Sequence, residues 1–146
     1  MLHLNFWYAW ASMLASVLLV FLLLEISIMG EAVIEAEETV WAAVGDQASL
    51  SCQLTEDKEV LQITWQKVLT EGEVSLATYA NTSGPRVRAG LQEKIDIQCE
   101  DLQSCSMVIR EVTEQDEGCY RCLFSIFPKR LQRATTCLRL YGEYML

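Results

Sequence analysis

Three widely separated elements of this sequence constrain its fold more than any other feature. Cys52 is followed by Trp65, and the segment Asp116–Cys122 reads Asp-Glu-Gly-Cys-Tyr-Arg-Cys. In a sandwich of two β-sheets, cysteines on facing strands can be bridged through the core, and a tryptophan packs against the bridge. A tyrosine two residues before the second cysteine bonds back to the chain at a corner between strands. The pattern therefore predicts a buried Cys52–Cys122 disulfide beside Trp65, with Tyr120 at the corner.

Short alternating segments place this pattern in an all-β fold. Hydrophobic and polar residues alternate over Ala48–Leu54 and around Ile63 and Trp65, as in strands with one buried face. Helical periodicity is not sustained after the N-terminal segment. We therefore predict an immunoglobulin variable-type β-sandwich, two antiparallel sheets in Greek-key order, over residues 38–142. Residues 143–146 are expected to form a short tail, and we expect no second domain.

The N-terminal segment has the composition of a targeting signal. Phe6 to Leu24 contains no charged residue, and small residues follow at Ser27 and Gly30. Such a run is typical of a secretory signal peptide, here residues 1–30. It is also long enough to span a bilayer as an uncleaved anchor. We expect an extracellular domain in either case, secreted after cleavage or anchored at the cell surface if the segment is retained.

The sequence has six cysteines, and all of them follow the signal segment. An even number in an extracellular protein predicts a set of disulfides. On the last two expected strands, the residues beside core-facing positions point outward, which pairs Cys119 with Cys137. Cys99 and Cys105 flank a short turn and are predicted to close that hairpin.

The composition excludes several classes of function. The only histidine is His3, in the signal segment, so catalytic Ser-His-Asp and Cys-His arrangements cannot form. Cys119 and Cys122 have the spacing of half a zinc site, but Cys122 is needed for the core bridge. The net charge of −9 argues against nucleic acid and anionic membranes as partners. We expect a protein that is not an enzyme, with no catalytic residue, metal, cofactor, small-molecule substrate or nucleic-acid partner.

Two further sites follow from local sequence. In variable-type domains an aspartate at the position of Asp116 commonly pairs with a basic residue at the start of a neighbouring strand and closes one end of the sandwich. Lys94, just before Ile95, is the expected partner, and Arg86 and Arg88 are the alternatives. Asn81 begins an Asn-Thr-Ser sequon in a predicted loop. We therefore expect N-glycosylation at Asn81.

One exposed sheet face is the candidate recognition surface. Leu123 is expected to point outward beside Arg121, and Phe127 lies in a loop just before Lys129 and Arg130. Apolar side chains and a basic cluster on one exposed face are typical of an interaction surface. The alternative is that Phe127 folds back over the end of the sandwich.

Three segments resemble one family. Ile63–Lys67, Asp116–Phe124 and Thr136–Leu138 are similar to the N-terminal variable domain of the OX-2 membrane glycoprotein family, whose members occur in hosts and in large DNA viruses. The resemblance covers roughly residues 38–142. A cysteine pair at the positions of Cys119 and Cys137 is characteristic of the family.

The resemblance implies a ligand for an inhibitory immunoglobulin-superfamily receptor, the OX-2 receptor, on myeloid cells, whose activation the ligand dampens. It implies binding through the face of the G, F, C and C′ strands of the variable domain. In this chain that face consists of Thr64 and Gln66 on C, Ala77 and Tyr79 on C′, Arg121 and Leu123 on F, and Phe127, Lys129 and Arg130 in the F–G loop. The alternatives are a cell-surface adhesion domain that self-associates through this face, and a truncated product without receptor activity.

The chain departs from the family pattern in two respects. Family members continue into a constant-type domain, a membrane span and a tail, none of which we expect here. The glycine-containing F–G loop common in the family is replaced by Ser125–Arg130. With its signal removed, the chain would be a single-domain soluble ligand, in contact with a membrane only if that segment is kept.

Overall fold

The structure, a computed structural model, describes residues 2–29 and 33–142 and forms two compact units, Met1–Ala32 and Val33–Leu146. The first unit contains one helix, α1 (Leu2–Met29). Among the described residues, no helix is both long enough and apolar enough to cross a membrane. The expected cleavage position at Gly30 and the expected tail, 143–146, lie outside the described residues.

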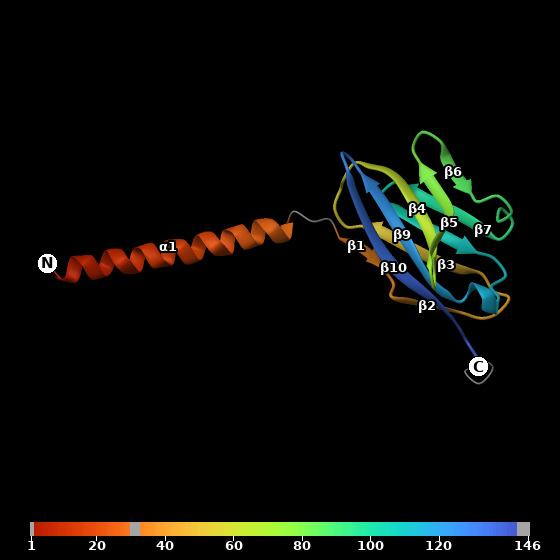
Figure 1. Cartoon of the computed structure of the whole chain (residues 1–146), viewed down its shortest axis with the longest axis horizontal. Helices are drawn as coiled ribbons and strands as arrows, with labels where there is room; N and C mark the ends of the chain where they lie inside the picture. Colours follow the sequence, from red (N-terminus) through yellow and green to blue (C-terminus); the bar gives the residue numbers. More distant parts are fainter. Residues whose placement is uncertain (1, 30–32, 143–146) are drawn as a thin grey trace. The chain divides into compact units, whose positions relative to one another are not determined.

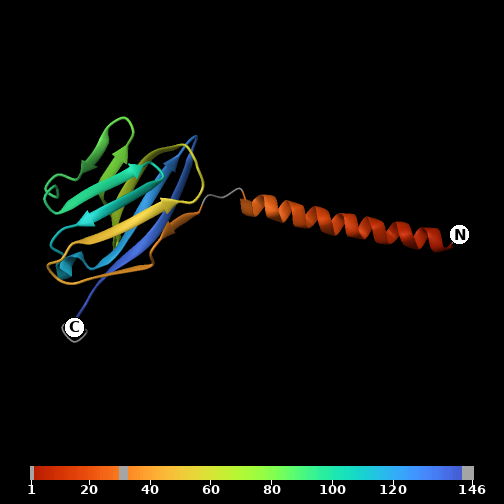
Figure 2. The same ribbon diagram turned by 180° about the vertical axis from the view of Figure 1, so that it is seen from behind.

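The second unit is a sandwich of two sheets. The six-stranded sheet, in the order β2-β10-β9-β4-β5-β6, is in front in Figure 1, and the four-stranded sheet, β1-β3-β8-β7, is in front in Figure 2. Neighbouring strands are antiparallel, apart from β2, which runs parallel to β10. This architecture confirms the all-β, variable-type sandwich predicted from the sequence. The strands are β1 Ile34–Ala36, β2 Thr39–Ala42, β3 Ala48–Leu54, β4 Val60–Leu69, β5 Gly72–Ala80, β6 Gly84–Val87, β7 Ile95–Asp101, β8 Ser104–Ile109, β9 Gly118–Ile126 and β10 Arg130–Leu140.

The core is built around the residues of the initial sequence pattern. Cys52 on β3 and Cys122 on β9 form a disulfide between the two sheets, with their Cα atoms 6.7 Å apart. Trp65 on β4 lies directly opposite Cys122 on the neighbouring strand, and its side chain is completely buried. Because β3 and β9 alternate between buried and accessible residues along most of their length, the bridge determines which side of each strand points outward.

A network around Asp116 closes one end of the sandwich. The carboxylate oxygen Oδ2 of Asp116 lies 2.6 Å from Lys94 Nζ and accepts the backbone N–H of Thr113 at 2.8 Å. Lys94 also donates to the carbonyl of Glu111 at 2.8 Å. The Tyr120 hydroxyl donates to the Asp116 carbonyl at 2.5 Å. Burial, with a smaller contribution from the Asp116 charge, raises the pKa of Tyr120 well above its ordinary value. These bonds join the entry to β9 with the segments that flank β7 and β8.

The Asp116 network gives a stability prediction. Replacing Asp116 by Ala leaves Lys94 half-buried without its counter-ion and Thr113 N–H without its acceptor, so we expect the free energy of unfolding to fall by about 2–3 kcal/mol. The matched control is Asp96→Ala, which breaks a more exposed pair with Arg110 at 3.6 Å. We expect that control to lose about 0.5 kcal/mol. Urea unfolding of the disulfide-intact protein measures both, and equal losses would contradict the structural role of Asp116.

The raised pKa of Tyr120 gives a prediction at alkaline pH. As the pH rises, the unfolded chain releases the Tyr120 proton before the folded domain does, so stability is present below the ordinary tyrosine pKa of about 10 and is lost above it. Between pH 9 and 11 we expect the free energy of unfolding to fall more steeply for the wild type than for Tyr120→Phe, by up to about 1.4 kcal/mol per pH unit. Tyr79→Phe serves as the control for removing a phenol. Parallel curves for the wild type and Tyr120→Phe would rule out this contribution.

Candidate recognition face

The outer face of the six-stranded sheet, here called the recognition face, is defined by the register of its strands. Residues directly opposite each other on neighbouring strands point to the same side of a sheet. Thr64 on β4 lies opposite Leu123 on β9 and Thr78 on β5. Leu123 lies opposite Arg133 on β10, and Thr78 lies opposite Arg86 on β6. These five residues form one row across five strands, with an arginine at each end.

A second row runs parallel to the first and contains a cation in its middle. Gln66 on β4 lies opposite Arg121 on β9 and Ser75 on β5, and Arg121 lies opposite Thr135 on β10. The Gln66 amide is 3.4 Å from the Ser75 hydroxyl. The Nε atom of Arg121 is buried and has no hydrogen-bond partner. Arg121 is therefore a partly desolvated cation diagonal to the apolar Leu123.

The turn between β9 and β10 extends the recognition face with exposed apolar and basic residues. Phe127 is 57% exposed and Leu131, at the start of β10, is 52% exposed. Lys129 and Arg130 are also exposed. The exposure of the Phe127 side chain argues against the alternative in which it folds back over the end of the sandwich.

The structure corrects two predicted members of the recognition face. Ala77 lies opposite Trp65 and is only 3% exposed. Tyr79 lies opposite Ile63, a buried residue of the core. Both positions therefore belong to the inner side of β5, and the alternation predicted for this strand was wrong by one residue.

The cause of this error is an irregularity between β4 and β5. The register shifts between Trp65 and Gln66, and as a result both Leu76 and Ala77 on β5 are buried. Trp65 lies opposite Ala77 and Gln66 lies opposite Ser75, so β5 has one residue more than β4 at this point, Leu76. Such a bulge reverses the inward and outward positions of the strand beyond it. Ser75 and Thr78 therefore take the outward places.

The structure also adds residues on β10 that the sequence reasoning did not include. Leu131, Arg133 and Thr135 lie opposite outward-facing residues of β9. Their positions could have been found by following the alternation backwards from the buried Leu138, the same reasoning that placed Cys137.

The second disulfide joins β9 and β10, two neighbouring strands of the recognition face. Cys119 on β9 and Cys137 on β10 lie opposite each other and are bonded. The pair is the one expected from strand alternation. It fixes the register of β9 against β10, and therefore the relative positions of Arg121, Leu123 and Arg133.

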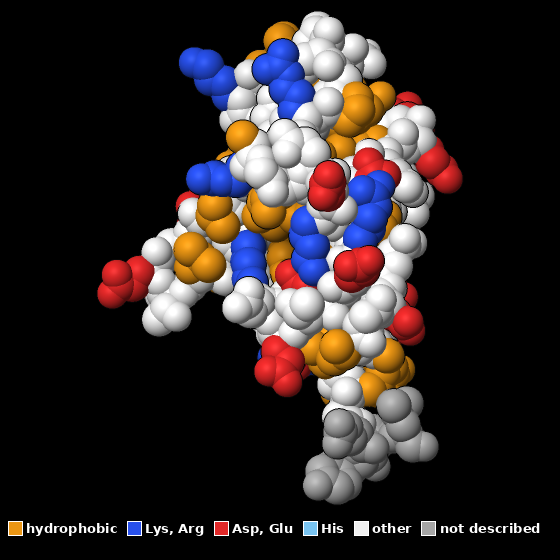
Figure 3. All heavy atoms as spheres, turned by 90° about the vertical axis from the view of Figure 1, so that its right-hand side faces the viewer, with side chains coloured by type: hydrophobic (Ala, Val, Ile, Leu, Met, Phe, Trp, Pro, Cys, Tyr) orange, Lys and Arg blue, Asp and Glu red, His pale blue; other side chains and the backbone are white. Residues whose placement is uncertain are grey.

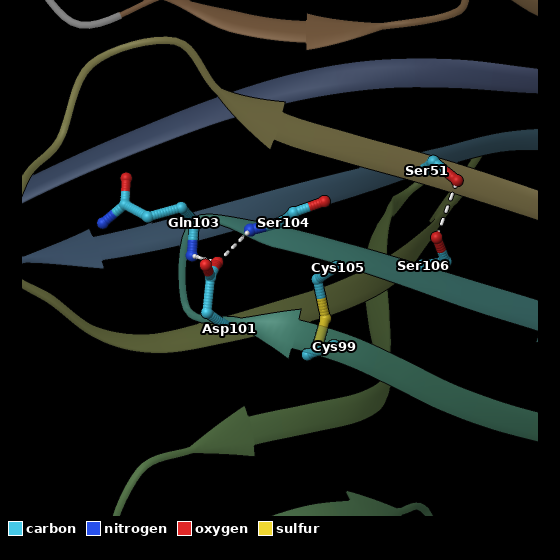
Figure 4. Close-up of a disulfide and its surroundings, with 7 residues drawn as sticks. All are labelled: Ser51, Cys99, Asp101, Gln103, Ser104, Cys105 and Ser106. Atoms are coloured by element: carbon cyan, nitrogen blue, oxygen red, sulfur yellow. Dashed lines mark hydrogen bonds between the residues drawn. A yellow bond between two sulfur atoms is a disulfide. The ribbon is translucent and has the colours of Figure 1, made fainter.

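The third disulfide lies in the other sheet, at the β7–β8 turn. Cys99 and Cys105 are bonded there, and Figure 4 shows the turn beside them. The Asp101 carboxylate accepts the backbone N–H groups of Gln103 and Ser104 at 2.7 and 3.1 Å. All six cysteines are paired within the chain. The described residues include no group of His, Cys, Asp or Glu arranged to hold a metal ion.

The lengths of the loops closed by these bridges predict their relative contributions. Replacing both Cys119 and Cys137 by Ala opens a loop with a sequence separation of 18, and we expect the free energy of unfolding to fall by about 3 kcal/mol. The control, Cys99→Ala with Cys105→Ala, opens a loop with a separation of 6, and we expect a loss of about 2 kcal/mol. Chemical unfolding tests this ranking, and a reversed order would contradict it.

Comparison with known proteins places the domain in a family. A family model described as the immunoglobulin V-set domain matches residues 35–141. The OX-2 membrane glycoprotein homolog of Human herpesvirus 8 type P (isolate GK18) is 36% identical over 93 residues, covering 64% of this chain and 34% of the relative. The OX-2 membrane glycoproteins of Rattus norvegicus and Homo sapiens are 36% and 33% identical over 96 residues, covering 66% of this chain and 34% of each relative. The chain thus spans about a third of the length of these relatives.

Among solved structures, murine CRIg superposes with a TM-score of 0.66 at 13% sequence identity, covering 77% of this chain and all of that one. This likeness supports the fold alone. The V-set match and the OX-2 relatives indicate a non-enzymatic immunoglobulin-superfamily protein of the cell surface or extracellular space, as expected from the sequence. The chain belongs to the immunoglobulin V-set family and, within it, is a member of the OX-2 family.

Proposed function

We propose that this chain is an OX-2-like immunomodulatory ligand that binds an inhibitory immunoglobulin-superfamily receptor, the OX-2 receptor, on myeloid cells and dampens their activation. The observation that carries the proposal is the composition of the recognition face in a member of this family. Leu123, Phe127 and Leu131 supply apolar contact area there, and they are surrounded by basic side chains that pair with no acidic group among the described residues. Buried apolar contacts within a polar rim are the usual arrangement of a protein–protein interface.

The rigidity of the recognition face favours a role in binding. Arg121, Leu123 and Arg133 lie on two neighbouring strands that a disulfide joins, and β9 is bridged to the other sheet through Cys122. Side chains held on a fixed sheet lose less conformational freedom on binding than side chains on mobile loops. A single domain with a modest contact area can therefore retain useful affinity.

The proposed ligand reaches its receptor through the secretory pathway. We propose that residues 1–30 are removed and that the domain is secreted, with anchorage at the cell surface as the alternative if the segment is retained. We also propose that Asn81 carries a glycan. Asn81 is exposed in the turn between β5 and β6, and β4 and β9 separate these strands from β10. A glycan there would lie to one side of Leu123 and Arg133.

Binding to the receptor ectodomain tests the proposal. We expect the purified, disulfide-intact protein to bind immobilised OX-2 receptor, and Leu123→Asp to weaken binding by at least about tenfold, because a charge replaces a central apolar contact. The control is Val44→Asp, a similar change at an exposed residue in the turn between β2 and β3, which should leave binding unchanged. Inhibition of cytokine release from receptor-bearing myeloid cells tests the proposed effect on activation.

The same samples distinguish the alternatives. Size-exclusion chromatography over a range of concentrations should show a monomer, and thermal melting should show that both variants are folded. Failure of a folded wild-type monomer to bind would contradict the proposed function. Concentration-dependent dimers that Leu123→Asp abolishes would instead favour an adhesion domain that self-associates through the recognition face.

A further inference from the structure

Charge is distributed unequally over the two sheets of this domain. The chain has a net charge of −9, yet β9 and β10 contain no Asp or Glu and four arginines. The outer side of the four-stranded sheet has the opposite character, because a shallow hollow of about 480 Å³ there is lined by Glu35, Glu37 and Glu100 together with small polar residues. The recognition face is therefore a basic surface on an acidic protein. The four arginines of β9 and β10 are Arg121, Arg130, Arg133 and Arg139.

Within residues 33–142, the part of the domain that the structure describes, the basic side chains of the recognition face form no ion pair. Among the described residues, the ion pairs are formed by Lys58, Lys94 and Arg110, and none of these residues lies on β9 or β10. Arg121 is the most telling case, since its buried Nε lacks any hydrogen-bond acceptor. A buried donor without a partner is costly. The other guanidinium nitrogens of Arg121 are not buried in this way, so a carboxylate from outside the chain could bind the cation through them.

The register sets the spacing of the charges. Arg86 and Arg133 end the same row, four strand spacings apart, which corresponds to about 19 Å between their backbones. Leu123 and two threonines lie between them, and Arg121 lies in the next row. Figure 3, which views the domain from the side carrying β6 and β7, shows Lys and Arg side chains beside hydrophobic ones, with Asp and Glu side chains among them. The cations thus surround an apolar centre rather than forming a separate patch.

We propose that the recognition face selects a protein partner whose docking surface presents Asp and Glu carboxylates around an apolar centre. The apolar centre packs on Leu123, and the carboxylates pair with Arg86, Arg121 and Arg133. Arginine suits this role because its planar guanidinium binds a carboxylate through two parallel hydrogen bonds. The inference rests on the proposed function, because it specifies the chemistry of the receptor surface that this face binds.

The arrangement favours an acidic protein over a sulfated polysaccharide or an anionic membrane. Leu123, Phe127 and Leu131 alternate with the cations, and a polysaccharide offers no apolar groups to cover them. The net charge of −9 also repels an extended polyanion at long range. A folded partner with a local acidic rim provides both kinds of contact.

The rate of association is the quantity that tests this inference. Charge complementarity across an interface mainly accelerates encounter, and salt screens it. Raising the ionic strength from about 0.1 to about 1 M shortens the Debye length from about 10 to about 3 Å. Over this range we expect the association rate constant of the wild type with the OX-2 receptor ectodomain to fall by about tenfold.

Charge variants assign the salt effect to the recognition face. Arg133→Gln and Arg86→Gln should each slow association severalfold at low salt and reduce the salt dependence. The control is Arg110→Gln, which removes an arginine paired with Asp96 outside the recognition face and should leave both unchanged. Thermal melting of each variant confirms that it is folded.

Three other outcomes would contradict either the inferred acidic partner surface or the proposed function. Receptor binding with an association rate that neither salt nor these variants alter would overturn the inference and leave the proposed function intact. Absence of binding by the folded wild type at every ionic strength would reject the proposed function, and the inference with it. Retention on immobilised heparin at physiological salt, in competition with the receptor, would replace the acidic protein surface by a sulfated polysaccharide.

Discussion

The disulfide between Cys52 and Cys122 is the constraint on which the rest of this domain depends. It links the two sheets through the core, and Trp65 lies opposite one of its cysteines. A strand that slipped by one residue would turn its whole hydrophobic set toward solvent. The bridge fixes one inward-pointing position on β3 and one on β9. Because side chains alternate along a strand, the residues on either side of each cysteine must then point outward. Arg121 and Leu123 point outward for this reason.

The Asp116 network performs a related task at one end of the sandwich. Lys94, Thr113 and Tyr120 all bond to Asp116, so the start of β9 is held against the segment leading into β7. The disulfide between Cys119 and Cys137 then links β10 covalently to the start of β9. The recognition face is therefore ordered by the core bridge, the Asp116 network and the Cys119–Cys137 bridge.

Much of this arrangement could be predicted from the sequence, because it follows from the alternation of side chains on either side of a few core residues, Cys52, Trp65 and Cys122. Alternation correctly oriented Leu123 and Cys137, and the usual ion pair of variable-type domains identified Lys94, ahead of Arg86 and Arg88, as the partner of Asp116. The same reasoning failed for Ala77 and Tyr79, since the register shift between β4 and β5 is a pairing feature that neither strand reveals alone. The unequal charge of the two sheets was also hidden, because acidic and basic residues that alternate along the chain separate only when the strands are ordered in space.

The pairing of every cysteine within the chain has a consequence for how such a protein acts on cells. These six cysteines therefore leave no free thiol from which a disulfide to another copy or to a receptor could form directly. Each engagement is then reversible, and occupancy follows the local density of ligand. A copy released into fluid is diluted as it diffuses, so receptor occupancy falls with distance from the cells that secrete it. Copies held together on one surface can instead rebind before they diffuse away.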